Sequence, residues 1–176
     1  MALKRVFSIR SLWPGAGLEN VVSSVISIMK EEMALDSVLV LAEEPVAKVL
    51  NCQVVVLGTG KVTDFQIKGH PINLMKYIYK RIVYVARLKC VLELNHGDVV
   101  VALDPEMSWV FKYLFKNVPV VPWIHGSLKA FWSKSGLWPL IRLGFKKSDA
   151  IIVLSEPMLQ EVSELCPEAR QKTFIV

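Results

Sequence analysis

Two glycines one residue apart, Gly15 and Gly17, precede a strongly apolar stretch in SLWPGAGLENVVSSVISIMK, residues 11–30. Small residues that lead into a helix let backbone N–H groups approach an anion, and the positive end of the helix dipole faces the same point. The sequence therefore predicts a phosphate-binding turn here, or a plain turn before a helix. A dinucleotide-binding GxGxxG motif is a weaker alternative, because Asn20 stands where that motif places its last small residue.

Polar residues also stand where expected strands end. Asp104 is the last residue of the stretch DVVVALD, and Ser155 is the last residue of DAIIVLS. The stretch VPVVPWIHGS ends with His125, Gly126 and Ser127. Ligands of parallel α/β sheets bind beyond the carboxyl ends of the strands. We therefore expect these corners and the loop at 10–17 to form the binding site. Two of these residues have an alternative role as N-caps, since Asp104 precedes Pro105 and Ser155 precedes a helical pattern.

The elements that must position these residues follow from the apolar pattern. We expect strands at 5–9, 37–42, 52–58, 98–104, 118–126, 149–155 and 172–176, and helices at 18–33, 71–94, 105–117, 135–147 and 156–165. Strands built as continuous Val, Ile and Leu runs are buried on both faces. Joined through helices, they predict an α/β fold with a Rossmann-like, doubly wound parallel sheet.

The long helix expected at 71–94 has two distinct sides. Its predicted core face carries Leu74, Ile78, Ile82, Val85 and Leu92, and its basic stripe carries Lys76, Lys80 and Arg87. The apolar face is expected to pack on the sheet. The basic stripe is expected to be solvated, or to attract a membrane or an acceptor.

Length and composition narrow the class of protein. The chain has 176 residues, of which 53% are hydrophobic, and a mean hydropathy of +0.41, enough for one domain with a sizeable core. No uncharged apolar stretch approaches the roughly 18–20 residues that span a bilayer. Arg10 interrupts the short apolar N-terminus, so no signal peptide is expected. Three widely spaced cysteines predict reduced thiols, with no metal site.

Positive charge is concentrated in one segment. Between Met107 and Ser148 there are seven basic residues and no acidic one, whereas the rest of the chain carries the other 14 of its 21 basic residues and all 16 acidic ones. This segment is also rich in Trp, Phe and Tyr. It predicts a surface for anionic lipid head groups, phosphorylated sugars or nucleic acid, or else solvated lysines over an aromatic core.

The order of several short motifs resembles the N-terminal half of the retaining glycosyltransferases of family 4, which have the GT-B architecture. The motifs are Ala16-Gly17-Leu18-Glu19, His125-Gly126 at a strand end, and the strand from Ala150 to Ser155 before a helix. Similar enzymes build lipopolysaccharide cores and other surface polysaccharides. The resemblance implies that residues 1–176 are a single acceptor-side domain, and that the C-terminal donor-binding domain is absent from this chain.

The resemblance also implies roles for individual residues. Gly15, Ala16 and Gly17 would approach the diphosphate of the donor. His125 would lie near the transferred sugar, with Asp104 as a candidate catalytic or acceptor-binding carboxylate, and Glu19, Gly126 and Ser127 would complete the motifs or contact the acceptor. Catalysis would rest on positioning and on electrostatic stabilisation of the leaving diphosphate.

The implied reaction is transfer of a hexose from a UDP- or GDP-sugar to a glycan or lipid-linked glycan, with retention and without a cofactor or metal. The expected location is cytoplasmic, with a possible peripheral contact with an anionic membrane at its inner face. Alone, the domain is expected to be inactive. A non-catalytic binding module that partners a donor-binding chain is the alternative, followed by an NAD(P)-binding oxidoreductase domain. Nucleic-acid binding is not expected, because no helix-turn-helix or RNP pattern is present.

Overall fold

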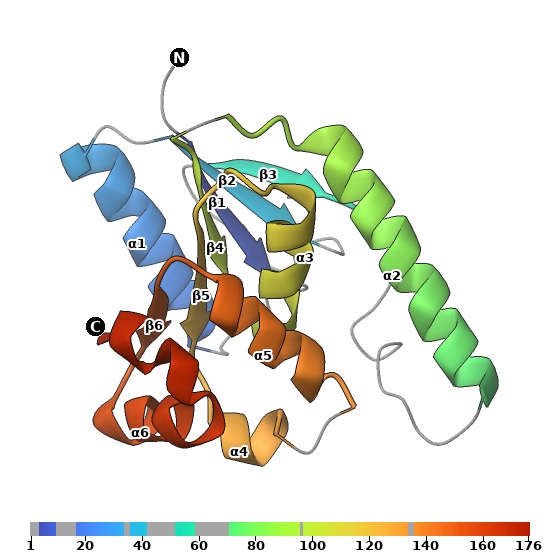
Figure 1. Ribbon diagram of the computed structural model, residues 1–176. Helices are drawn as coiled ribbons and strands as arrows, with labels where there is room; N and C mark the ends of the chain where they lie inside the picture. Colours follow the sequence, from blue (N-terminus) through green and yellow to red (C-terminus); the bar gives the residue numbers. More distant parts are fainter. Residues whose placement is uncertain are drawn as a thin grey trace. The chain divides into compact units, whose positions relative to one another are not determined.

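The structure is a computed structural model that describes residues 4–9, 17–33, 36–41, 52–58, 71–95, 97–133 and 136–176 (Figure 1). Its strands are β1 (Lys4–Ile9), β2 (Asp36–Leu41), β3 (Gln53–Val56), β4 (Val99–Ala102), β5 (Val120–Ile124), β6 (Ile151–Val153) and β7 (Thr173–Ile175). They form a seven-stranded sheet in the order β3-β2-β1-β4-β5-β6-β7. All strand pairs with a defined register are parallel, which confirms the predicted α/β fold.

The chain divides into two compact units, one formed by Leu3–Ser8 with Leu94–Val176 and the other by Ile9–Glu93. The helices of the first unit are η2 (Pro105–Met107), α3 (Ser108–Leu114), α4 (Leu128–Phe131), α5 (Trp138–Lys147), α6 (Glu156–Leu165) and η3 (Pro167–Lys172). Within the described residues of the second unit, the helices are α1 (Leu18–Met33) and α2 (Pro71–Val91).

The first unit has a core between its strands and its C-terminal helices. The buried cluster consists of Ile124, Leu128, Ile141, Phe145, Ile151, Val153, Leu159, Val162, Cys166 and Ala169. Burying a side chain of the Leu, Ile or Phe type contributes roughly 1.5–3 kcal/mol. This cluster therefore anchors the loops that follow β5 and β6.

The second unit buries one side of each of its helices. Val22 and Ile26 of α1, one turn apart, have no exposed surface, and Tyr84 and Leu88 of α2 are likewise buried. In addition, the Arg87 guanidinium donates hydrogen bonds to the carbonyl oxygens of Leu57 and Gly58, after β3. This contact joins α2 to the end of its own unit's strand.

The predicted core face of α2 is wrong at Ile82, which is 62% exposed. Ile82 lies about 160° around the helix from buried Tyr84, because each residue advances by about 100°. Met75 and Tyr79, at 69% and 68% exposed, lie on the same outer side. The helix is therefore apolar on two sides, and its periodicity did not indicate which of them is buried.

Two predicted helices differ from the observed ones. The helix expected at 105–117 begins as the 3₁₀ turn η2, in which the Met107 amide donates to the Asp104 carbonyl at 2.9 Å, and its α-helical part ends at Leu114. The expected helix at 135–147 corresponds to α5, and the four-residue α4 before it was not predicted. A helix this short has no detectable period, and contacts from α6 hold it in place.

Candidate functional site

The carboxyl ends of β4, β5 and β6 lie along one edge of the sheet of the first unit. Ala102 of β4 pairs with Pro122 of β5, and Ile124 of β5 pairs with Val153 of β6. The loops after these strands carry Asp104, His125 to Ser127, and Ser155. The structure therefore places all the predicted strand-end residues of this unit at one edge.

His125 is the first residue after β5, and its side chain is exposed. A short loop separates His125 from α4, which begins at Leu128. Gly126, the next residue, does not have a positive φ, and a Cβ placed on it would be 3.6 Å from the Phe131 ring, an ordinary contact distance. The imidazole thus faces solvent from a position at the end of a buried strand.

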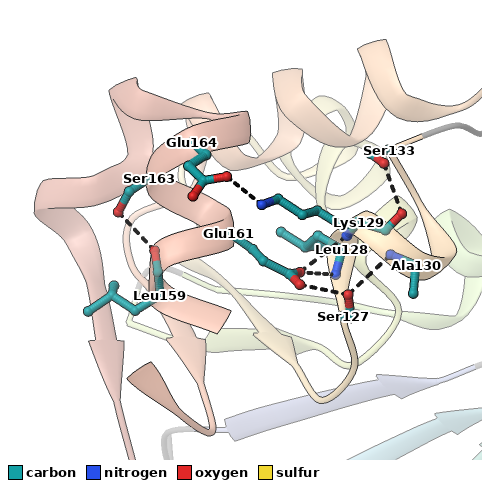
Figure 2. Close-up of polar contacts among 9 residues, drawn as sticks. All are labelled: Ser127, Leu128, Lys129, Ala130, Ser133, Leu159, Glu161, Ser163 and Glu164. Carbon is teal, nitrogen blue, oxygen red and sulfur yellow. Dashed lines mark hydrogen bonds and ion pairs between the residues drawn. The ribbon is translucent and has the colours of Figure 1, made fainter. Parts of the chain in front are cut away.

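A carboxylate from α6, that of Glu161, fixes the loop and helix start that follow His125, and Figure 2 shows its contacts with Ser127 and the start of α4. Ser127 Oγ donates to Glu161 Oε1 at 2.7 Å, and the amides of Leu128 and Lys129 donate to Glu161 Oε2 at 2.6 and 3.2 Å. Ser127 Oγ in turn accepts from the Ala130 amide at 3.1 Å as the N-cap of α4. The otherwise unpaired amides at this helix start are therefore satisfied by side chains.

The ionised form of Glu161 is favoured by this arrangement. Burial alone would raise its pKa, but the hydrogen bonds from Ser127 and from the two backbone amides outweigh burial and hold the pKa below its usual value. Glu161 was missed in the sequence analysis. It lies 34 residues from Ser127, and no local pattern connects them.

The predicted role of Ser127 is narrowed by these contacts. Its hydroxyl group donates to Glu161 and accepts from Ala130, so it is engaged within the protein. These bonds assign it a structural part in shaping the loop, and contact with an acceptor stays a prediction.

Asp104 occupies the N-cap position of η2, but its side chain makes no capping hydrogen bond. The residue is only 8% exposed, and Glu106, a second carboxylate two residues further along the chain, is 2% exposed. Ser155 is the N-cap of α6, also without a side-chain capping bond. Both residues therefore hold the cap positions expected of them, while their side chains do not cap.

The glycine turn belongs to the second unit. Gly15 and Ala16 lie outside the described residues, whereas Gly17 has a φ of +73°, a conformation that favours glycine. The Gly17 carbonyl accepts from the Val21 amide at 3.2 Å, which makes Gly17 the entry to α1. For Glu19 the structure describes only its position, in the first turn of α1.

Within the described ranges no group of three or more His, Cys, Asp or Glu side chains is arranged to hold a metal ion. Over the same ranges, no helix has the length and apolar character required to cross a bilayer.

The basic segment at 107–148 is partly neutralised by the C-terminal part of the chain. Lys112 forms an ion pair with Asp149 at 2.6 Å, Lys129 with Glu164, and Arg142 with Glu168 at 2.9 Å. Three basic residues of this segment make no ion pair within the described ranges: Lys116, Lys146 and Lys147. The segment's aromatic residues divide similarly. Phe111 and Phe145 are fully buried, in agreement with an aromatic core, whereas others are exposed.

Comparisons with known proteins identify similar folds. The chain matches no protein-family model and no curated protein sequence. It is similar to the apo form of the lipopolysaccharide outer core galactosyltransferase WaaB, with 14% identity and a TM-score of 0.64, over 98% of this chain and 45% of WaaB. The Anabaena protein HepE in complex with UDP and glucose has 12% identity and a TM-score of 0.63, over 99% and 44% of the two chains.

A plant protein shows the same relation. Apo UGT2 of Phytolacca americana has 10% identity and a TM-score of 0.60, over 99% of this chain and 51% of UGT2. The chain thus spans about half the length of these structures. Its parallel α/β fold is similar to that of about half of each of these structures.

Proposed function

We propose that this chain is the N-terminal, acceptor-side half of a nucleotide-sugar-dependent glycosyltransferase. The observation that carries the proposal is the match of almost the whole chain to about half of each of several glycosyltransferase structures. The carboxyl edge of the first unit, with exposed His125, supplies a site of the kind that such an enzyme requires.

The proposed reaction is transfer of a hexose with retention. WaaB, a galactosyltransferase of the lipopolysaccharide outer core, supports a glycan acceptor, and HepE in complex with UDP and glucose supports a UDP-sugar donor. In the proposal His125 contacts the sugar, and Gly15, Ala16 and Gly17 approach the diphosphate. Asp104, which is 8% exposed, is the candidate catalytic or acceptor-binding carboxylate of the proposal.

Glu161 is the positioning residue of this proposal. Its carboxylate binds Ser127 and the start of α4, directly after His125, so the imidazole is carried on a loop fixed at its C-terminal side. Groups held in place before the reaction stabilise a transition state without reorganisation.

The test compares this chain with the complete reading frame of its gene. Both forms are incubated with a panel of UDP- and GDP-sugars and assayed for hydrolysis and transfer, each with His125→Ala and with Gln160→Ala, an exposed α6 residue, as matched control. Activity in a longer form that is lost in His125→Ala but kept in Gln160→Ala supports the proposal. If the frame ends at Val176 and no nucleotide sugar is turned over, the catalytic proposal fails in favour of a binding module.

We further propose that α2 contacts an anionic membrane peripherally. Its 21 residues include five basic and no acidic residues, and Met75, Tyr79 and Ile82 form an exposed apolar stripe. Helices that combine these features bind in the interface of anionic bilayers.

A vesicle sedimentation assay tests this proposal. Ile82→Glu should reduce binding, while Ile28→Glu, at an exposed position of α1, should not. Equal effects of the two variants would contradict the proposal.

A further inference from the structure

A pocket of about 370 Å³ lies between α3 and α5 in the first unit. It is lined by Trp109, Lys112, Tyr113, Lys116, Leu143 and Lys147. The volume is within the range of small-molecule sites, about 300–1,000 Å³. Three lysines and two aromatic residues therefore line the same pocket.

The pocket's lysines are at the amino edge of the sheet. Lys112 is in the last turn of α3, before β5, and Lys147 ends α5, before β6. Asp149 confirms this location, since its carboxylate accepts from the amide of Val120 at 2.8 Å, at the start of β5, and pairs with Lys112. His125 follows the opposite ends of these strands, so the proposed reaction does not use this pocket.

Lys112 forms part of the pocket wall. Its ammonium group pairs with Asp149 and donates to the Val118 carbonyl at 3.2 Å, and its side chain is 12% exposed. Burial would raise the pKa of Asp149, but the hydrogen bonds from Lys112 and the Val120 amide outweigh burial and lower it. Lys112 is thus neutralised and fixed.

Lys116 and Lys147, in contrast, make no ion pair or hydrogen bond within the part of the chain that the structure describes. Lysines at helix C-termini commonly compensate the helix dipole. At the C-terminus of α5 the helix dipole is compensated by Lys172, whose ammonium group donates to the carbonyls of Lys146 and Ser148 at 2.8 and 2.6 Å. The positive charge of Lys147 therefore remains available to a ligand.

The rest of the pocket is apolar. Trp109 is half-buried, Tyr113 is 72% exposed, and Leu143 is exposed beside them. None of the residues that line the pocket is acidic, and the neighbouring Asp149 carboxylate is paired with Lys112. A ring or another apolar body can lie against the aromatic side chains while its anionic group meets the lysines.

We propose that this pocket binds a phosphate group carried by a planar or apolar body, with Lys116 and Lys147 binding the phosphate and Trp109 and Tyr113 contacting the body. Such a phosphate comes either free in solution or as the head group of an anionic lipid. The proposal is independent of the glycosyltransferase assignment.

The test measures binding to the full chain by NMR titration with phenyl phosphate, with inorganic phosphate for comparison, and by sedimentation with phosphatidic acid vesicles. The variants are Lys116→Gln and Lys147→Gln, with Lys146→Gln as control, because Lys146 is exposed on the same turn of α5 but does not line the pocket. Loss of one charge-assisted hydrogen bond is expected to weaken binding about tenfold.

A second pair of variants tests the aromatic part. Tyr113→Ser should weaken phenyl phosphate binding and leave inorganic phosphate unaffected, while Phe131→Ser, at a residue equally exposed at 71% but outside the pocket, should change neither. Thermal unfolding of each variant shows that it is folded.

Binding of phenyl phosphate that Lys116→Gln or Lys147→Gln weakens and Lys146→Gln does not supports the site with a free phosphate as its ligand. The same pattern with vesicles alone supports it with a lipid head group. Absence of binding to both probes, or an equal effect of Lys146→Gln, overturns the proposal.

Discussion

At the residue scale, single side chains decide the geometry of both candidate sites. Glu161 organises the loop after β5 although it belongs to α6, and Lys112 and Asp149 connect the end of α3 to the starts of β5 and β6. In each case a charged group satisfies backbone amides or carbonyls near the end of a helix or the start of a strand. We expect such groups to stabilise a loop more than exposed ion pairs do. An exposed ion pair contributes at most about 1 kcal/mol to the free energy of unfolding.

Glu161→Gln is expected to destabilise the chain by about 1 kcal/mol at pH 7, the typical value of a helix cap. An amide offers one acceptor oxygen where the carboxylate uses two. The measurement is urea denaturation. Glu164→Gln, which removes only an exposed pair with Lys129, is the matched control and should have a smaller effect.

The same variant predicts a pH dependence. The pKa of Glu161 is lower in the folded state than its unfolded value of about 4.3, so its contribution is present above that value and is lost as the pH falls through the folded pKa. The difference between the parent chain and Glu161→Gln should therefore shrink as the pH is lowered from 7 to 3. A constant difference would show that the carboxylate charge is not involved.

Gly144 provides a steric prediction at the same scale. A Cβ at this position of α5 would contact the Ser108 hydroxyl and lie 2.7 Å from the Trp109 backbone nitrogen. Ser108 cannot move freely, since its Oγ donates to the Pro105 carbonyl at 2.6 Å. Gly144→Ala is expected to cost about 1–3 kcal/mol in denaturant unfolding. Gly136→Ala, which meets nothing within 4 Å, should cost much less.

At the scale of the element, α5 serves two different surfaces. Ile141 and Phe145 have no exposed surface and belong to the core cluster, whereas Leu143 and Lys147 line the pocket with α3. The close approach of α3 to α5 at Gly144 leaves the pocket beside it.

Ile141→Ala should lower the free energy of unfolding by about 2–5 kcal/mol, because it leaves a cavity in the core. Leu143→Ala removes a side chain of similar size that is already 42% exposed. It is expected to lower the free energy of unfolding by less than about half as much as Ile141→Ala does. Equal losses in denaturant unfolding would show that the face assigned to the pocket is packed in solution.

At the scale of the whole molecule, acidic residues after position 148 compensate part of the basic segment. Asp149, Glu164 and Glu168 each pair with one of its cations, while the chain keeps a net charge of +5. Within the described part of the basic segment, the unpaired positive charge is therefore carried by Lys116, Lys146 and Lys147. The chain also divides into two compact units, each with its own buried residues.

The three free thiols differ in exposure, so their reactivity tests the packing of the two units. Cys90 is exposed, Cys52 is partly buried, and Cys166 is buried in the first unit's core, where burial raises its pKa and so reduces its thiolate. Alkylation followed by mass spectrometry should modify Cys90 first and Cys166 last. Rapid modification of Cys166 in the absence of denaturant would contradict the packing of α6 and η3.

The architecture could be predicted from the apolar pattern of the chain. Continuous runs of Val, Ile and Leu can only be buried on both faces, so they predicted parallel strands joined by helices. The bounds of α1 and α6 agree with those predicted, because each has a clear amphipathic period and a start signal, Gly17 or Ser155 with Pro157. The strand-end position of His125 followed from the same pattern.

Which side chains contact one another could not be predicted and is known from the folded chain. It placed Glu161 on the loop that follows His125, paired three of the basic segment's cations, and left Lys116 and Lys147 beside Tyr113. It also turned Ile82 outward, against the predicted core face. These outcomes depend on contacts between residues far apart in the chain, and helical periodicity indicates which residues share a face but not what that face will meet.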